Sequence, residues 1–257
     1  MIEAFHLRAL ARGVPLFEDL TLVFGEGEAW IVSGPPSSGK SLLLRILSGD
    51  RRPDAGDVMT GGESLYGKDP AVLHRFRLQS AFVPESLPAT GQTPDDLFHL
   101  SALSAGDIPR KERDRREEEL LALLGVAGTG PVPLSRLSVS ERTRVALGAE
   151  LLRGPKVLFL DMVLANAGKD WTDSLLGLFR ALAREGRTIV MMERELPDRW
   201  KGVAPPDAPL AADPRIREAG PFRLFGVAGG IRTPPPARPA RPPGGAGAVV
   251  GEEEPSR

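Results

Sequence analysis

The sequence contains no cysteine, only 5% aromatic residues and no long apolar run. Without cysteine it can form neither disulfides nor thiolate metal sites, and such a composition suits a reducing cytosol. No stretch of about 18 apolar residues is present, as a membrane-spanning helix would need. The N-terminus also lacks the charged-then-apolar pattern of a signal peptide. We therefore expect a cytoplasmic location, with any membrane contact peripheral.

An excess of charge of one sign is also lacking, since 33 basic residues nearly balance 34 acidic ones and the net charge is −1. A chain so close to neutrality has no overall attraction for nucleic acid, so we expect no nucleic-acid partner. The three histidines, His6, His74 and His99, are scattered and indicate no metal cluster. The length of 257 residues, 41% of them hydrophobic, predicts one main domain.

A glycine-rich octet is the most informative stretch that is present. It fits the pattern G-x-x-x-x-G-K-[ST], in which glycines let the backbone turn so that successive N–H groups point at phosphate. In this pattern Lys40 reaches the β and γ phosphates, and the Ser41 hydroxyl is a ligand of Mg²⁺. The candidate nucleotide-binding residues are Gly34, Pro35, Pro36, Ser37, Ser38, Gly39, Lys40 and Ser41.

The surroundings of the octet argue against a chance match, because an apolar run precedes it and a helical pattern over Leu42–Leu47 follows it. Short apolar runs recur along the chain with helical patterns between them, which predicts an α/β fold with a mostly parallel sheet flanked by helices. Residues 3–33, broken by glycines, predict a small N-terminal β subdomain. The predicted sheet strands are Trp30–Ser33, Ser80–Val83, Val157–Asp161 and Thr188–Met192.

The character of the sequence changes between about residues 86 and 140, where we predict a helical insert. Thr93 is expected to cap a helix that has Pro94 at its first position. Ser138 and Glu141 have the spacing of a capping box at the start of a later helix.

Proline accumulates at the end of the chain, where the last 55 residues hold 12 of the 25 prolines. A segment with so little apolar surface cannot offset its ordering entropy. We therefore divide the chain into a domain over residues 1–202 and a Pro/Gly/Ala-rich, largely disordered tail over residues 203–257. Residues 221–225 are the one apolar island in the tail, either an edge strand, a docking segment or a brief contact with the body.

The order of these features resembles the ATPase subunits of ABC transporters: a phosphate loop, a helical insert, the Leu137-Ser138 turn, and apolar strands ending at Asp161 and near Met192. The resemblance covers residues 1 to about 200 and implies a P-loop NTPase fold of ABC type that binds ATP and Mg²⁺. It also implies a membrane permease as partner, a homodimer or a heterodimer with another ATPase subunit, and a place at the inner face of the cell membrane. Residues 52–56 and 123–126 look most like the lipoprotein-release, macrolide-export and cell-division branch.

The resemblance implies roles for single residues as well. Asp161 matches the aspartate that holds Mg²⁺ through water, so Ser41, Asp161 and Glu85 form the expected metal site. Ser138 matches the serine that bonds the nucleotide of the opposing subunit.

Several positions depart from the family pattern. Met162 replaces the glutamate that polarises the attacking water, Arg194 replaces the histidine at the γ phosphate, and Glu85 replaces a glutamine. Methionine cannot accept a proton, so the general base is missing. Since the histidine and glutamine positions are changed as well, no catalytic residue is intact and we expect hydrolysis to be impaired. Glu193 or Glu195 is left open as a substitute base. The signature Leu-Ser-Gly-Gly-Gln reads Leu137-Ser138-Val139-Ser140-Glu141, and the aromatic expected near residue 11 is missing.

Three functions are compatible with these residues. The first is an ATP-binding subunit of an ABC-type membrane complex, which binds Mg-ATP to drive or gate transport of an unknown substrate. The second is a nucleotide-sensing regulatory or scaffold protein without transport activity, and the missing catalytic groups favour it. The third, another P-loop class such as a small-molecule kinase, has no need of the helical insert. The overall order of motifs favours the first.

Overall fold

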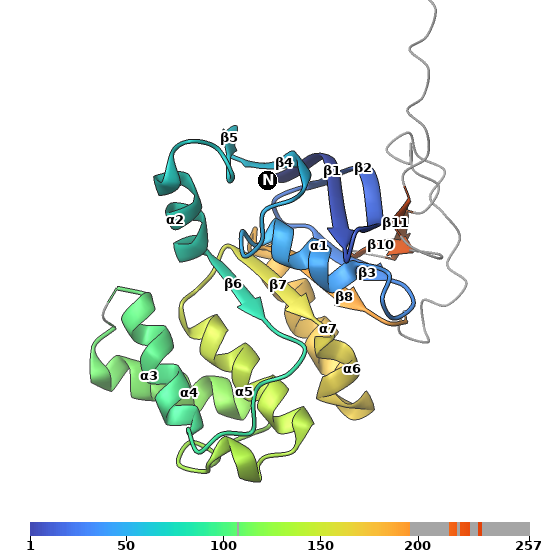
Figure 1. Ribbon diagram of the computed structural model, residues 1–257. Helices are drawn as coiled ribbons and strands as arrows, with labels where there is room; N and C mark the ends of the chain where they lie inside the picture. The colour runs from blue at the N-terminus through green and yellow to red at the C-terminus, as the bar shows by residue number, and fades with distance from the viewer. Residues whose placement is uncertain (107, 196–215, 220–221, 227–230, 233–257) are drawn as a thin grey trace, which may run out of the picture.

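The computed structural model describes the backbone at residues 1–106, 108–195, 216–219, 222–226 and 231–232, and the side chains up to Glu195 with residue 107 excepted. Within these residues two β-sheets share an apolar layer, and most helices gather beyond the larger sheet (Figure 1). Each sheet draws its strands from distant parts of the sequence.

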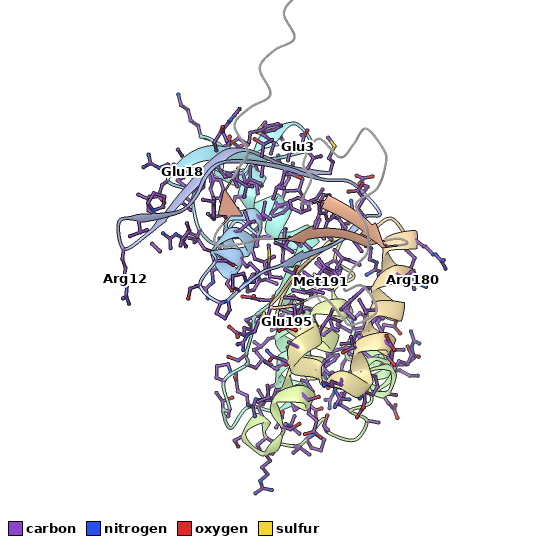
Figure 2. The ribbon with its side chains drawn as sticks, turned by 90° about the vertical axis from the view of Figure 1, so that its right-hand side faces the viewer. Glu3, Arg12, Glu18, Arg180, Met191 and Glu195 are labelled. Atoms are coloured by element: carbon purple, nitrogen blue, oxygen red, sulfur yellow. The ribbon has the colours of Figure 1, made fainter. Side chains whose placement is uncertain are left out.

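The smaller sheet is mainly antiparallel and confirms the group of strands predicted within residues 3–33. Its two longest strands form a hairpin that carries the exposed Arg12 at its tip (Figure 2). Leu20, Leu22 and Phe24 alternate with exposed residues and are buried, as expected for a sheet that covers a core with one face. In spatial order the strands are β11 (Ile231–Arg232), β2 (Val14–Phe24), β1 (Ile2–Ala11), β4 (Ala55–Thr60) and β5 (Glu63–Ser64).

The larger sheet contains all four strands predicted from apolar runs, and they run parallel to one another. The carboxyl ends of these strands therefore meet at one edge, which is where ligands bind in open parallel sheets. In spatial order the strands are β6 (Ser80–Val83), β7 (Val157–Asp161), β8 (Thr188–Glu193), β3 (Ala29–Ser33), β10 (Phe222–Gly226) and the antiparallel β9 (Ile216–Ala219).

Both faces of the larger sheet are buried, which explains why its strands read as continuous apolar runs rather than alternating ones. In β3, Trp30 and Val32 face the layer shared with the smaller sheet, where α1 (Lys40–Leu47) and α2 (Pro70–Gln79) also pack. Ile31 faces the opposite way, into the core formed with the remaining helices. Met191 of β8 lies in that second core (Figure 2).

The helices on the second face begin where the sequence places their caps. Thr93 caps α3 and Ser138 caps α5, each through a capping box, and Pro94 occupies the first turn of α3 as predicted. Together with α4 these helices form a separate green group in Figure 1, away from the smaller sheet. The helices and the intervening 3₁₀ turn are α3 (Pro94–Ser104), α4 (Arg110–Leu123), η1 (Leu134–Arg136), α5 (Val139–Leu152), α6 (Val163–Ala167) and α7 (Lys169–Arg184).

The apolar island of the tail is a strand, but it is not at an edge. β10 pairs in parallel with β3 on one side and antiparallel with β9 on the other, so the prediction of an edge strand is wrong, and β9 takes the edge. The reason is that a second strand, Ile216–Ala219, folds back on it, which the Phe222–Phe225 pattern alone does not reveal. The domain boundary at residue 202 and the disorder of the tail stay predictions, and most of residues 203–257 lie outside the described residues.

Two truncations test whether the tail strands belong to the folded body. Ending the chain after Arg232 removes no described strand and should leave the melting temperature within about 1–2 °C of the full chain. Ending it after Pro214 removes β9–β11 and leaves the edge of β3 without its five-residue partner, so we expect a drop of several degrees, on the order of 5 °C. Calorimetry of both variants measures this. Equal melting temperatures for all three chains would contradict the pairing of β10 with β3.

Candidate nucleotide-binding site

The glycine-rich octet forms a loop between β3 and α1, as the sequence predicts. Gly39 ends the loop with φ 93°, and a Cβ added there would lie 3.2 Å from Cβ of Leu16. Both facts demand glycine at this position. Gly39 offers no side-chain cap to α1, so the N–H groups of its first turn face the loop without one. Pro35 and Pro36 have no N–H, so the backbone donors for an anion come from Ser37 onward.

Lys40 folds back over this loop. Lys40 is 7% exposed, and its ammonium donates to the carbonyl oxygens of Gly34 and Pro35, both at 2.7 Å, and to Ser38 Oγ at 3.1 Å. Burial lowers the pKa of the Lys40 ammonium, and the nearby Asp161 carboxylate opposes that shift. The loop thus holds a positive charge at its centre by two carbonyl groups and a hydroxyl, and a phosphate oxygen could take the place of any of them.

Ser41 and Asp161 meet although 120 residues separate them. Ser41 Oγ donates to Asp161 Oδ1 at 3.1 Å, which brings the start of α1 to the end of β7. Asp161 is 5% exposed, and burial raises the pKa of its carboxyl, with the Ser41 hydrogen bond opposing. Of the three predicted metal ligands, these two lie in direct contact.

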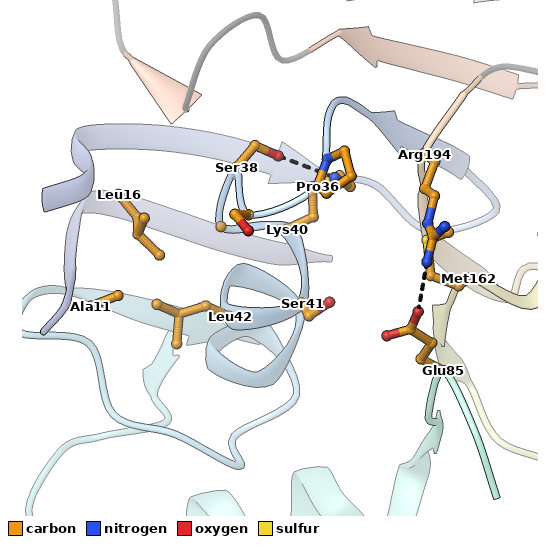
Figure 3. A pocket seen from close by; sticks show the side chains of 12 residues that line it. Ala11, Leu16, Pro36, Ser38, Lys40, Ser41, Leu42, Glu85, Met162 and Arg194 are labelled. Atoms are coloured by element: carbon orange, nitrogen blue, oxygen red, sulfur yellow. Dashed lines mark hydrogen bonds and ion pairs between the residues drawn. The ribbon is translucent and has the colours of Figure 1, made fainter. Parts of the chain in front are cut away.

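Glu85, the third predicted ligand, faces a different partner. Its carboxylate lies 3.3 Å from the Arg194 guanidinium, across the mouth of the site (Figure 3). The side-chain amide of Asn166 donates to the main-chain carbonyl of Glu85. Asn166 was not identified from the sequence, where nothing local signals a contact with a residue 81 positions away.

These groups surround an open hollow of about 400 Å³. Apolar side chains from the β1–β2 hairpin line one side, and Met162 and Arg194 line the other (Figure 3). None of the described lining residues is aromatic, in keeping with the missing aromatic near residue 11. The lining residues are Ala11, Leu16, Pro36, Ser37, Ser38, Gly39, Lys40, Ser41, Leu42, Glu85, Met162 and Arg194.

Met162 stands in a left-handed turn between β7 and α6. Its φ is 56°, its side chain is 5% exposed, and its N–H donates to the carbonyl of Met192 at 2.8 Å. A left-handed conformation costs a non-glycine residue roughly 1–2 kcal/mol, so neighbouring contacts must hold the turn. The thioether at the wall of the hollow can neither accept a proton nor orient water strongly.

The two carboxylates considered as substitute bases lie in different surroundings. Glu193 is 2% exposed and accepts the backbone N–H groups of Leu164 at 2.8 Å and Ala165 at 3.3 Å. Burial raises the pKa of the Glu193 carboxyl to about 7, although these N–H groups oppose the shift. Glu195 is exposed. Neither carboxylate is among the described residues that line the hollow.

Ser138 lies away from the phosphate loop, at the exposed start of α5. Its hydroxyl donates to Glu141 Oε2 at 2.7 Å, its N–H donates to the same oxygen at 2.8 Å, and the Glu141 N–H returns a bond to Ser138 Oγ at 3.2 Å. Val139 beside it is 49% exposed. The structure therefore does not bring Ser138 to the hollow of its own chain.

The residues that the structure describes contain no group of three or more histidine, cysteine or acidic side chains arranged to hold a metal ion. No helix among them has the length and apolar character required to cross a bilayer.

Similarity to other proteins agrees with this geometry. The family described as "ABC transporter" matches residues 17–164. Among relatives, the methionine import ATP-binding protein MetN 2 of Pseudomonas syringae pv. tomato is 29% identical over 76% of this chain and 60% of its own length. MetN of Thermobifida fusca is 31% identical over 76% of this chain and 63% of its own. The chain thus spans about 60% of the length of these relatives. The lipoprotein-release, macrolide-export and cell-division branch stays a prediction.

Solved structures share the fold. A dimeric ATP-binding cassette in a post-hydrolysis state, bound to ADP and Pi, superposes with a TM-score of 0.68 at 20% identity, covering 76% of this chain and 88% of that one. An ATP-binding subunit of an ABC transporter gives 0.66 at 21% identity, covering 76% and 80%. The α/β P-loop fold of ABC type predicted from the sequence is confirmed. By its matched residues and its fold, this chain belongs to the ABC transporter family, as an ATP-binding cassette.

Proposed function

We propose that this chain binds Mg-ATP as the ATP-binding subunit of an ABC-type membrane complex, and that its own hydrolysis is slow. One observation carries the proposal: a complete phosphate loop, with Lys40 at its centre and Ser41 bonded to Asp161, shares a hollow with Met162. The phosphate loop supports binding, while Met162 stands at the position where the family carries a glutamate.

Phosphate binding follows from the loop's charge and donors. The N–H groups from Ser37 to the first turn of α1 point their partial positive charge at the loop, and Lys40 adds a full charge. On binding, the Lys40 ammonium would exchange loop carbonyls for phosphate oxygens. Arg194, which is exposed and pairs with Glu85, would turn its guanidinium to the outermost phosphate.

The residues present fit Mg²⁺. Ser41 and Asp161 offer a hydroxyl and a carboxylate oxygen 3.1 Å apart, which are the hard ligands this ion prefers. Magnesium sites commonly use one or two carboxylates together with substrate phosphates and water, so a larger protein cage is not needed. When bound, the ion neutralises phosphate charge. Glu85 would contribute only after leaving Arg194.

The start of α5 bears on whether this chain pairs with a second copy of itself or with a different ATPase subunit. Glu141 already occupies the Ser138 hydroxyl and N–H, so this end of the helix presents a carboxylate and an exposed Val139 instead of free donors. Such a surface is poorly suited to the phosphates of an opposing nucleotide. A homodimer would carry this surface and Met162 at both of its sites, so we favour a heterodimer in which the other ATPase subunit has its own glutamate, and a permease as the membrane partner. In this arrangement ATP closes the dimer as a latch.

The same departures favour a second candidate, a nucleotide-sensing regulator without transport activity. Met162 and Glu141 suit a protein that binds ATP without consuming it. Membrane fractionation separates the two candidates. A transport subunit should sediment with membranes and copurify with a permease in detergent, whereas a regulator should stay in the supernatant whether or not ATP is present.

The first prediction for the site concerns binding. Lys40→Ala removes the only charge at the loop centre and should weaken Mg-ATP binding by more than tenfold, on the order of 2 kcal/mol. Isothermal calorimetry with and without Mg²⁺ measures this, and the exposed Lys68→Ala is the matched control. If wild type and Lys40→Ala bind ATP equally under both conditions, the loop is not a phosphate site.

The second concerns turnover. Met162→Glu should raise ATP hydrolysis, at most by the roughly 10²- to 10⁴-fold that a positioned general base contributes. Met162→Gln has the same length without the base and should show no gain. Absence of a gain with glutamate would place the defect at Val139 or Arg194. A wild-type turnover of several per second, abolished by Glu193→Gln, would refute slow hydrolysis and identify Glu193 as a base.

A further inference from the structure

We infer that Glu193 is a positioning residue: its carboxylate holds the first turn of α6 and thereby fixes where the side chain at position 162 meets the hollow. This inference rests on the proposed function, because it concerns how that site is assembled. It assigns Glu193 a task other than that of a base.

Glu193 is buried at the end of a central strand. β8 lies between β7 and β3, and the Glu193 side chain is 2% exposed. A carboxylate in such a place needs donors. It has two, since Oε1 accepts the Leu164 N–H and Oε2 accepts the Ala165 N–H. Each oxygen is thus committed to the backbone of α6, and Glu193 is not among the described residues that line the hollow, whereas Arg194 is.

α6 depends on this contact because the residue at its N-cap position does not cap it. Met162 is the N-cap residue and makes no side-chain cap hydrogen bond. The N–H groups of a helix's first turn lack partners within the helix, and a nearby carboxylate oxygen is the acceptor that suits them best. Glu193 supplies from another strand what serine or aspartate would supply at position 162.

The end of β8 also touches the turn and the phosphate loop through its main chain. The Met192 carbonyl accepts the Met162 N–H at 2.8 Å, and the Glu193 carbonyl accepts the Gly34 N–H at 3.3 Å. The left-handed turn at Met162 is therefore held on both sides, by Met192 before it and by Glu193 after it. Residue 193 links the loop that holds phosphate to the position where a catalytic glutamate would stand.

The charges around Glu193 agree with a fixed, internal role. Asp161 and Lys40 are the charged groups that act on it, with opposite signs. Arg194, the next residue, follows the alternation of a strand and turns into the hollow, where it meets Glu85. Glu193 thus contacts α6, while its neighbour Arg194 lines the hollow.

Amide hydrogen exchange tests the contact directly and requires no nucleotide. In Glu193→Ala we expect exchange at the Leu164 and Ala165 amides to rise by about tenfold or more, while Glu193→Gln, which keeps one acceptor oxygen, should protect at least one of them. Glu195→Ala is the control for loss of a neighbouring carboxylate on the surface. Unchanged exchange at both amides in Glu193→Ala would overturn the inference.

Turnover separates positioning from base catalysis. In Met162→Glu, where position 162 carries a base, Glu193→Ala should lower single-turnover hydrolysis by about tenfold with the ATP dissociation constant within about twofold, and Glu193→Gln should restore most of the rate. If glutamine is as damaging as alanine, Glu193 is a base and the inference is wrong. A drop in ATP affinity equal to the drop in rate would show that Glu193 serves only general stability, and that result would also overturn the inference. Failure of the proposed function itself would appear in the Lys40→Ala binding test, not in the exchange data.

Discussion

The hydrogen bond between Ser41 and Asp161 is the contact on which the site depends. It forms only if β7 and β3 lie in one parallel sheet, with β8 between them, in a register that brings both carboxyl ends to one edge. Parallel strands cannot be joined by tight turns, so the chain between these strands must cross over through helices. The fold thereby brings the start of α1 and the end of β7 together from 120 residues apart.

Burial of charge at that edge is the second constraint. Lys40, Asp161 and Glu193 are each less than about a tenth exposed, and each is satisfied mainly by backbone groups or a single hydroxyl. Because such groups are already desolvated, an incoming phosphate meets a preformed field and little reorganisation is required. The opposite charges of Lys40 and Asp161 also partly offset each other.

Three of the departures from the family pattern fall on one wall. Met162, Arg194 and Glu85 line the same part of the hollow, and Glu193 supports that wall from behind. The phosphate loop keeps its motif residues, with Lys40 bonded to loop carbonyls and Ser41 to Asp161. These substitutions are therefore consistent with a protein in which ATP binding and ATP consumption are separated, as proposed above.

The sequence by itself determined the features with local signals: the phosphate loop, the four apolar strands, the N-cap at Thr93 and the capping box at Ser138. Periodicity, glycine placement and cap residues act within a few positions, so they can be read without the fold. Only the tertiary structure decided that Glu193 caps α6, that Arg194 pairs with Glu85, and that β10 is internal. Each depends on strand register and on contacts between residues far apart in the chain. A carboxylate at a strand end has the same local sequence whether it faces solvent, a ligand or a helix, so the sequence cannot distinguish these cases.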